Sequence, residues 1–404
     1  MSGIRPRFPV GVLRGTRHKK PEHGISNERP ESLPLAGVTA HQGRQIHNIE
    51  MAPQGDNVVR TMSTAPAVWF PAIRSGTGAD VFTLRLCEGL NARGIRAAIT
   101  WLPHRAEYLP WSVPVPQPPN WATIVHVNTW LHPRFIPRHL PVVATLHHSV
   151  HDPALRPYKG LPRAAYHRFW IAPVERQVMR RARRVVAVSR FAADMARVTL
   201  CDLTMQVIHN GIDTARFRPA DDRTTPHQPF RLLYVGSWMA RKGVSLLAPI
   251  MRELGEGFVL HYTGGPVAEK DKAGMPDNMV DIGRLSADRV METMQQADAF
   301  LFPSRSEGLP LAVMEAMASG LPVIATNGSS LPEVVEHGVT GIVCERDNVQ
   351  AFVKAIHALN DSPAVWRKLS CSAAERAMRR FSIHTTIERY LVVYQEIQSE
   401  GGTE

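Results

Sequence analysis

Apolar residues in this chain come in short runs that alternate with amphipathic stretches. The first such unit reads "APAVWFPAIRSGTGADVFTLRLCEGLNARGIRAAITWLP", in which an apolar run, a glycine loop, a stretch of helical spacing and a second apolar run follow one another. Short apolar runs bounded by glycine, proline or polar residues predict buried strands, and i, i+3, i+4 spacing predicts a helix. The order strand, helix, strand predicts an α/β fold.

The alternation occurs twice along the chain. The first set continues through "ATIVHVNTW", "PVVATLHHS", "RVVAVS" and "MQVIHNG", and a polar, proline-bearing stretch, "FRPADDRTTPHQPF", follows it. The second set contains "RLLYVGS", "FVLHYTGG", "MVDIG", "ADAFLFPS", "LPVIAT" and "TGIVCE". Two such sets predict two doubly wound, Rossmann-like domains that face each other across a cleft. In sheets of this kind, ligands bind outside the carboxyl ends of the strands.

These patterns set the expected domain boundaries. The N-terminal domain is predicted at residues 63–218, the linker at 219–229 and the C-terminal domain at 230–384. Residues 385–404 are predicted to form a C-terminal helix that crosses back to the first domain.

The N-terminal segment, residues 1–62, reads differently from the rest of the chain. It is rich in glycine, proline and charge and has neither helical nor strand periodicity, which predicts a disordered tail. Translation from Met62 in place of Met1 is an alternative that the sequence leaves open.

Composition narrows the function classes. The hydrophobic share of 44% is that of a globular protein, and no apolar run reaches the roughly 18 residues of a membrane span. The four cysteines have no paired spacing, which argues against a zinc site or a disulfide framework and favours a cytoplasmic protein. The formal net charge of +11 indicates anionic partners, such as nucleotide phosphates, nucleic acid or an acidic membrane face.

Two glutamates eight positions apart are the strongest candidates for chemistry. Glu307 and Glu315 lie in "FLFPSRSEGLPLAVMEAMASGLPVIAT", which reads as strand, loop, helix, glycine stop and strand, with Glu315 about two turns into the helix. A pair of glutamates at this spacing occurs about once by chance in such a chain, so the interpretation depends on the sequence around the pair. The loop-to-helix junction is an anion site, and carboxylates accept hydrogen bonds from hydroxyls on either side of a diphosphate. The simplest interpretation is a nucleotide-sugar site, with one glutamate for the sugar and one for the ribose.

The stretch resembles the Glu-x7-Glu signature of glycosyltransferase family 4, retaining sugar transferases of the GT-B fold. Further segments match the family in order, namely "RSGTGAD", "VVATLHHS", "VVAVSRF", "VIHNGIDTARFRP" and "YVGSWMARKGVSLL". The resemblance runs from about residue 66 to about residue 395. Each segment alone is a weak match to the family, but the combination of segments is specific for it.

The resemblance implies roles for individual residues. Glu307 would contact the hydroxyls of the donor sugar, Glu315 the ribose, Lys242 the pyrophosphate, and His147 the region of the reacting carbon. The other residues that it places in the donor site are Gly76, Gly78, Ser237, Arg241, Arg284, Gly308, Leu309 and Leu311. Roles without function stay open as alternatives. In these, Gly76 and Gly78 are turn residues, Lys242 is a solvated lysine and Arg284 is an exposed loop residue.

Three histidines need separate interpretation. His147 and His148 are adjacent, so strand alternation sends only one of them into the cleft, and the family match favours His147. His126, within "IVHVN", is expected to be a structural strand residue whose hydrogen bonds are satisfied.

One departure concerns the diphosphate site. The family usually has an arginine directly after the glycine of the "YVG" segment, and this chain has Ser237. Arg241 could replace that arginine in part, although neighbouring loop residues need not point together. The chain contains no Asp-x-Asp pair, so we expect a metal-independent enzyme without a cofactor. The leaving diphosphate would be stabilised by Lys242, Arg241 and the helix N-terminus.

The resemblance implies transfer of a hexose, with retention of configuration, from a nucleotide-diphosphate sugar to a saccharide or lipid-linked acceptor. A place in cell-surface polysaccharide or glycolipid biosynthesis follows from the same resemblance. The run from Arg163 to Arg184, "RAAYHRFWIAPVERQVMRRARR", mixes aromatic residues with arginines and predicts peripheral contact with the anionic inner face of the cytoplasmic membrane. An arginine-rich solvated helix is the alternative.

Other function classes remain as alternatives. A non-catalytic nucleotide-sugar-binding protein would fit the departure at Ser237, and a GT-B-like nucleotide-sugar epimerase would bind the same donor. Nucleic-acid binding has no supporting motif. A nicotinamide enzyme is disfavoured because no G-x-G-x-x-G follows the first strand.

Overall fold

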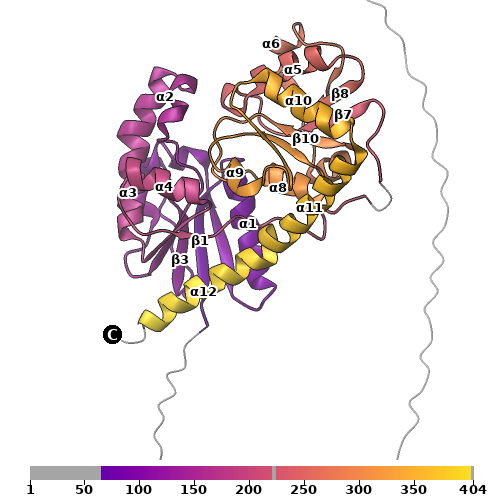
Figure 1. Cartoon of the computed structure of the whole chain (residues 1–404). Helices are drawn as coiled ribbons and strands as arrows, with labels where there is room; N and C mark the ends of the chain where they lie inside the picture. The colour runs from indigo at the N-terminus through magenta and orange to yellow at the C-terminus, as the bar shows by residue number, and fades with distance from the viewer. Residues whose placement is uncertain (1–64, 221–223, 402–404) are drawn as a thin grey trace, which may run out of the picture. The chain divides into compact units, whose positions relative to one another are not determined.

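Two parallel, six-stranded sheets form the frame of the protein in a computed structural model that describes residues 65–220 and 224–401 (Figure 1). Both sheets belong to one unit of the chain that begins at Arg60. The predicted tail, residues 1–62, lies outside the described residues.

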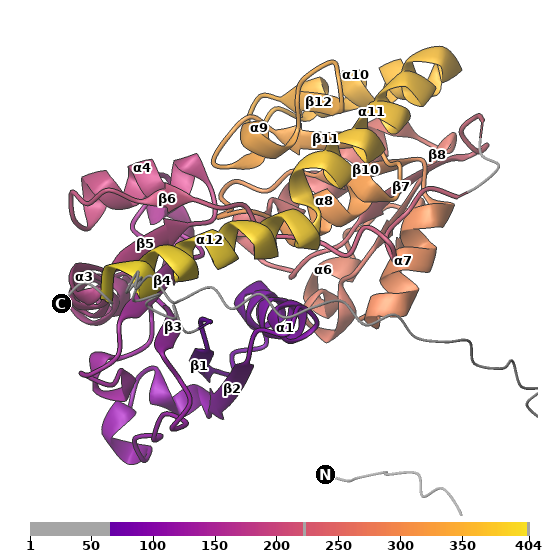
Figure 2. The same cartoon turned by 90° about the horizontal axis from the view of Figure 1, so that it is seen from below.

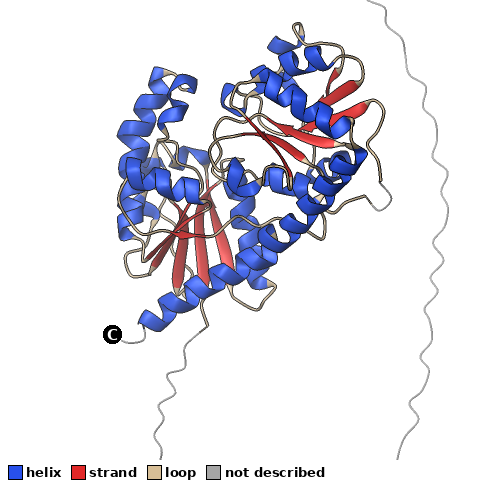
Figure 3. Ribbon diagram, in the orientation of Figure 1, coloured by secondary structure: helices blue, strands red, loops and turns tan. Residues whose placement is uncertain are grey.

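The first sheet has the strand order β2-β1-β3-β4-β5-β6. Its strands are β1 (Val68–Ile73), β2 (Ala97–Leu102), β3 (Ile124–Asn128), β4 (Val142–Leu146), β5 (Arg184–Ala187) and β6 (Gln206–Val207). Its helices are α1 (Gly78–Asn91), α2 (Leu161–Tyr166), α3 (Ala172–Arg181) and α4 (Arg190–Thr199), with a π-helical segment η5 (His167–Ile171) between α2 and α3 and a 3₁₀ segment η4 (Pro153–Tyr158) before them. Figure 3 shows helices flanking this sheet.

The second sheet has the order β12-β11-β10-β7-β8-β9. Its strands are β7 (Phe230–Tyr234), β8 (Phe258–Tyr262), β9 (Met279–Asp281), β10 (Ala299–Phe302), β11 (Val323–Thr326) and β12 (Gly341–Cys344). Its helices are α5 (Leu247–Leu254), α6 (Glu269–Lys272), α7 (Ala287–Gln296), α8 (Leu311–Ala318), α9 (Leu331–Val334), α10 (Val349–Asn360) and α11 (Pro363–Phe381). Two parallel sheets with crossover helices confirm the predicted fold class, a pair of Rossmann-like domains.

Local sequence explains why these elements form. In β4 and β10 every residue is buried, because a central parallel strand is covered by helices on both faces. Several helices begin after a polar side chain that accepts a hydrogen bond from a free backbone N–H, as Ser189 does for α4 and Asn348 for α10. After α8 the chain turns at Gly320, whose φ of +78° is a conformation that glycine adopts without steric cost.

The last helix, α12 (Ile383–Gly401), packs against the first sheet although it follows the second domain in sequence (Figure 2). Its apolar face contributes Ile387, Tyr390, Val393, Tyr394 and Ile397 to the cluster that holds Val68, Phe70 and Leu86.

His126, in strand β3 of the first sheet, is hydrogen-bonded to this helix. The Nδ1 atom of His126 lies 2.6 Å from the hydroxyl of Tyr394, and its Nε2 lies 2.7 Å from the hydroxyl of Thr145. Both ring nitrogens are therefore satisfied, which confirms the structural interpretation of His126. Burial lowers the pKa of this histidine to about 3, and nearby His147 acts in the same direction.

Candidate functional site

A cavity of about 700 Å³ is lined by loops of both domains. The first domain contributes the glycine loop after β1 and the residues that follow β3 and β4, and the second contributes the loops after β7 and β10. The cavity therefore lies at the carboxyl ends of the parallel strands, where doubly wound sheets bind ligands.

Most of the predicted site residues line this cavity. They are Gly76, Gly78, His147, Ser237, Arg241, Lys242, Glu307, Gly308, Leu309 and Leu311. Two predicted residues are not among the lining residues, namely Glu315 and Arg284. The side chain of Arg284 lies near Gly265, because a Cβ atom added to Gly265 would be 3.6 Å from Cγ of Arg284.

The carboxylate of Glu307 is the centre of the charged groups. Its side chain is almost fully buried, and its Oε1 accepts hydrogen bonds from Nζ of Lys242 at 2.7 Å and from the hydroxyl of Ser304 at 2.5 Å. The guanidinium of Arg241 lies 3.7 Å from its Oε2. Burial alone would raise the pKa of Glu307, but the charges of Lys242 and Arg241 and the two hydrogen bonds hold that pKa below its usual value.

Arg241 and Lys242 therefore converge on the same carboxylate although they are adjacent in the chain. Arg241 also donates to the carbonyl of Ser306 at 2.6 Å, which fixes its direction. Two cations and one carboxylate leave an excess positive charge in the cavity, which favours an anion there. Ser237, which stands where an arginine was expected, lines the same cavity.

Two glycines allow the loops of the site to approach one another. A Cβ atom on Gly308 would lie 1.7 Å from the carbonyl oxygen of His147, so only glycine fits between this loop and the end of β4. Gly243, at φ +71°, follows Lys242 and would place a Cβ 1.9 Å from the carbonyl oxygen of Pro303. The hydroxyl of Ser189 donates to the carbonyl of Gly308 at 2.7 Å, which adds a polar contact between the two domains.

Both histidines after β4 line the cavity, so the expectation that only one would reach it is wrong. The strand ends at Leu146, and strand alternation does not extend to residues beyond that end. The Nε2 atom of His147 lies 2.8 Å from Oδ1 of Asn128. Neither ring nitrogen of His148 has a hydrogen-bond partner within the part of the chain that the structure describes.

Burial keeps both of these imidazoles neutral. It lowers the pKa of His147 to about 4, with Asp80 acting weakly in the opposite direction. It lowers the pKa of His148 to about 3, assisted most by the charge of Arg241. A neutral His148 with two unpaired nitrogens beside the cations is a cavity residue that sequence reasoning missed, because strand alternation was taken to send only His147 into the cleft.

We expect these histidines to make the protein less stable in mild acid. His126, His147 and His148 have folded-state pKa values of about 3 to 4, whereas an unfolded histidine titrates near 6.5. As pH falls below about 6.5, the unfolded chain binds protons that the folded chain does not, so the free energy of unfolding should decrease. Urea unfolding at pH 7 and pH 5 tests this in a window where most carboxylates stay ionised. An equal or higher free energy of unfolding at pH 5 would contradict the prediction.

The first domain also lines the cavity with residues that sequence reasoning did not assign to the site. They are Glu107, Lys159, Arg163 and His167, which come from the loop after β2 and from the segment between β4 and α3. They share no fixed spacing, so a motif search has no signal for them.

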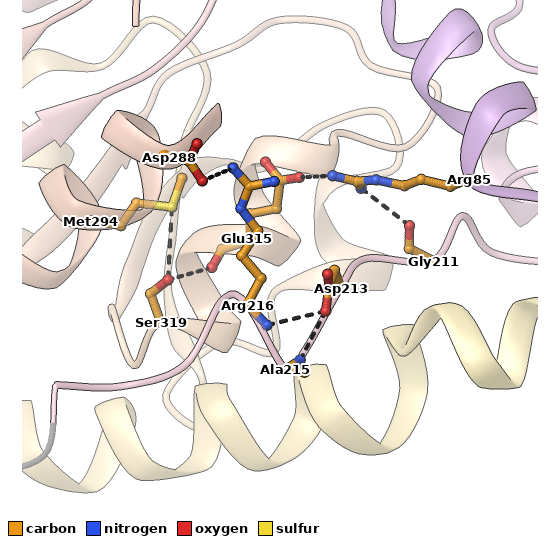
Figure 4. Close-up of polar contacts among 9 residues, drawn as sticks. All are labelled: Arg85, Gly211, Asp213, Ala215, Arg216, Asp288, Met294, Glu315 and Ser319. Atoms are coloured by element: carbon orange, nitrogen blue, oxygen red, sulfur yellow. Dashed lines mark hydrogen bonds and ion pairs between the residues drawn. The ribbon is translucent and has the colours of Figure 1, made fainter. Parts of the chain in front are cut away.

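Glu315 has a different environment from Glu307. Helix α8 begins at Leu311, so Glu315 lies about one turn into the helix rather than the two turns expected. Its Oε1 accepts a hydrogen bond at 2.9 Å from Arg85, a residue of α1 in the first domain (Figure 4).

Two family models match this chain. Residues 119–216 match the model described as Glycosyltransferase Family 4, and residues 218–377 match the model described as Glycosyl transferases group 1. Together the matches cover more than half of the chain, including Lys242 and both glutamates. The chain belongs to the family 4 type of GT-B glycosyltransferases.

Several named proteins are similar to this chain. The amylovoran biosynthesis glycosyltransferase AmsK of Erwinia amylovora is 26% identical over 208 residues, and the match spans 48% of this chain but only 51% of that relative. The alpha-maltose-1-phosphate synthase of Mycobacterium tuberculosis is 28% identical over 314 residues, which span 68% of this chain and 79% of that enzyme. The crystal structure of Anabaena HepE in complex with UDP superposes with a TM-score of 0.65 at 16% identity, and covers 82% of this chain and all of that one.

Proposed function

We propose that this family 4 glycosyltransferase moves a hexose from a nucleotide-diphosphate sugar to a saccharide or lipid-linked acceptor, with retention of anomeric configuration. The contact between Lys242 and Glu307 in the cavity carries the proposal. It places a cation suited to a diphosphate beside a carboxylate suited to sugar hydroxyls. The UDP bound by HepE supports a nucleoside diphosphate as the leaving group.

The charged groups define the chemistry of the transfer. The glycosidic bond forms between an acceptor hydroxyl and the anomeric carbon, while the bond from that carbon to the diphosphate breaks. Lys242 and Arg241 stabilise the charge that develops on the departing diphosphate, and a diphosphate oxygen takes the acceptor proton. Glu307 orients the sugar through its hydroxyls, and His147 lines the same cavity as a neutral hydrogen-bonding group.

The acceptor binds on the side of the cavity that belongs to the first domain. Glu107, Lys159, Arg163 and His167 line that side and offer both charges to a saccharide. The name of the Erwinia relative associates it with the biosynthesis of amylovoran, which supports a role of this chain in the synthesis of cell-surface polysaccharide or glycolipid.

A screen of nucleotide sugars tests the function directly. A donor present at a hundredfold excess over its dissociation constant should stabilise the protein by about 2.7 kcal/mol, which is a measurable shift of the melting temperature. Incubation of that donor with candidate acceptors should give a product with the configuration of the donor. Binding without transfer or hydrolysis would indicate a non-catalytic protein, and conversion of the donor into an isomer would indicate an epimerase.

Chelators should leave the activity intact. Lys242 and Arg241 supply the positive charge for the diphosphate, so the transfer does not require a divalent cation. Initial rates with and without EDTA test this. Loss of turnover in EDTA, with recovery when Mg²⁺ or Mn²⁺ is added, would contradict the metal-independent mechanism.

Peripheral membrane contact is proposed for the region around α2. Leu161 and Phe169 are strongly exposed, and Arg168 stacks on Phe169 with its guanidinium carbon 5.8 Å from the ring centroid. One later arginine of the run, Arg176, is used internally, since it donates to the carbonyl of Leu200. Among residues 65–220 and 224–401, no helix has the length and apolarity of a membrane span.

We expect the protein to bind anionic vesicles and to be released by salt. Arginine contacts are screened over about 8 Å at physiological ionic strength, so 1 M NaCl should release the protein from phosphatidylserine vesicles. The pair Arg168→Gln and Phe169→Ser should weaken sedimentation with the vesicles, whereas Arg379→Gln, at an exposed site on α11, should not. Retention through the salt wash would contradict electrostatic binding at a cytoplasmic membrane face.

A further inference from the structure

One ion pair joins the signature helix of the second domain to the first domain. The guanidinium of Arg85, in α1, donates from its Nη2 atom to Oε1 of Glu315, in α8, at 2.9 Å (Figure 4). The side chains are only 20% and 13% exposed. Among the described residues, the Glu315 side chain accepts its hydrogen bond from Arg85.

The other arginine drawn beside Glu315 pairs with a different carboxylate. Arg216, in the segment that leads from the first domain to the second, places its Nη2 atom 2.5 Å from Oδ1 of Asp288, in α7. Figure 4 shows this second pair beside the first. Arg85 has one further acceptor, the carbonyl of Gly211, at the longer distance of 3.5 Å.

The geometry points to Arg85 as a positioning residue for the nucleotide ribose, acting from the opposite domain through Glu315. This inference rests on the proposed function. Arg85 engages one oxygen of the carboxylate and fixes its orientation, while the other oxygen and the remaining lone pairs can accept from ribose hydroxyls. Because the two partners belong to different domains, the ribose contact depends on their approach.

Helix α1 is placed to link this contact to the rest of the site. Its N-terminal residue Gly78 lines the cavity, and a Cβ on Gly78 would lie 3.6 Å from Cδ1 of Leu311, the first residue of α8. The starts of the two helices are therefore in close contact, and Arg85 reaches Glu315 about two turns further along α1. A shift between the domains that opened the cavity at Gly78 would also lengthen the ion pair.

The experiment compares ligands with and without ribose. Affinities of the full chain for UDP, GDP, ADP and inorganic pyrophosphate are measured by calorimetry for wild type, Arg85→Met, Arg85→Lys and Glu315→Gln. We expect Arg85→Met to weaken the preferred nucleoside diphosphate about tenfold and to leave pyrophosphate within about twofold. Arg85→Lys should keep most of the affinity, because it retains a charge. In the double variant with Glu315→Gln the losses should not add, since both changes remove one interaction.

A matched arginine controls for general effects on α1. Arg93 lies in the turn that ends this helix and contacts the ring of His384 at 2.8 Å, away from Glu315, so Arg93→Met should leave all affinities unchanged. Melting temperatures confirm that each variant is folded. Unchanged nucleotide affinity in Arg85→Met, or equal losses for pyrophosphate and nucleotide, would overturn the inference. Failure of the wild type to bind any of the three nucleotides would instead overturn the proposed function, and the ribose role with it.

Discussion

Replacing Glu307 by glutamine should lower turnover by about 100- to 1,000-fold and leave the affinity for nucleoside diphosphate intact or higher. Glutamine keeps the shape of the side chain but removes the charge that we propose faces the sugar, and the loss of one such preorganised group typically costs this much. The same change frees Lys242 and Arg241, which now share their charge with Glu307, for the diphosphate. Initial rates and calorimetric titration with UDP, measured on the same preparation, test both halves of the prediction.

Stability has to be measured alongside, because Glu307 is buried between two cations. Breaking a buried ion pair costs several kcal/mol when the remaining charge has no access to water. Because the Lys242 side chain is 15% exposed, the cost should be smaller here. Glu292→Gln, at an exposed ion pair on α7, is the control and should leave turnover unchanged. If turnover and diphosphate affinity fell together in Glu307→Gln, the carboxylate would serve the diphosphate site and not the sugar.

The fold could be predicted from sequence because each strand carries its own signal. Runs such as "VVATL" and "AFLF" are short, apolar and bounded by polar or turn residues, and both became fully buried central strands. These signals are local, so they do not depend on knowing which distant segments meet.

The contacts that complete the site have no local signal. Arg85 and Glu315 are 230 residues apart in sequence and meet only because α1 and α8 start side by side. The spacing within "EGLPLAVMEAMASG" identified both glutamates as a pair, yet only Glu307 lines the cavity. His148 was missed because strand periodicity was applied to the two residues beyond the end of β4.

Gly308→Ala should reduce turnover by at least about 100-fold while both domains remain folded. The added Cβ would lie 1.7 Å from the carbonyl oxygen of His147 and 3.0 Å from Cα of His148. Neither backbone atom can move aside as a flexible side chain would, so the loop that carries Glu307 must shift away from the first domain. A misplacement of about 1 Å at a reacting centre is enough to cost two orders of magnitude.

Gly257→Ala provides the matched control, because a Cβ at that position meets no atom within 4 Å. Turnover, UDP affinity and near-UV circular dichroism are measured for both variants. We expect Gly308→Ala to retain the dichroism spectrum of a folded protein, since the change lies between the domains and not inside either apolar core. Full activity in this variant would show that the close approach of Gly308 to the end of β4 is not needed for transfer. Loss of the folded spectrum would show instead that this approach stabilises the protein as a whole.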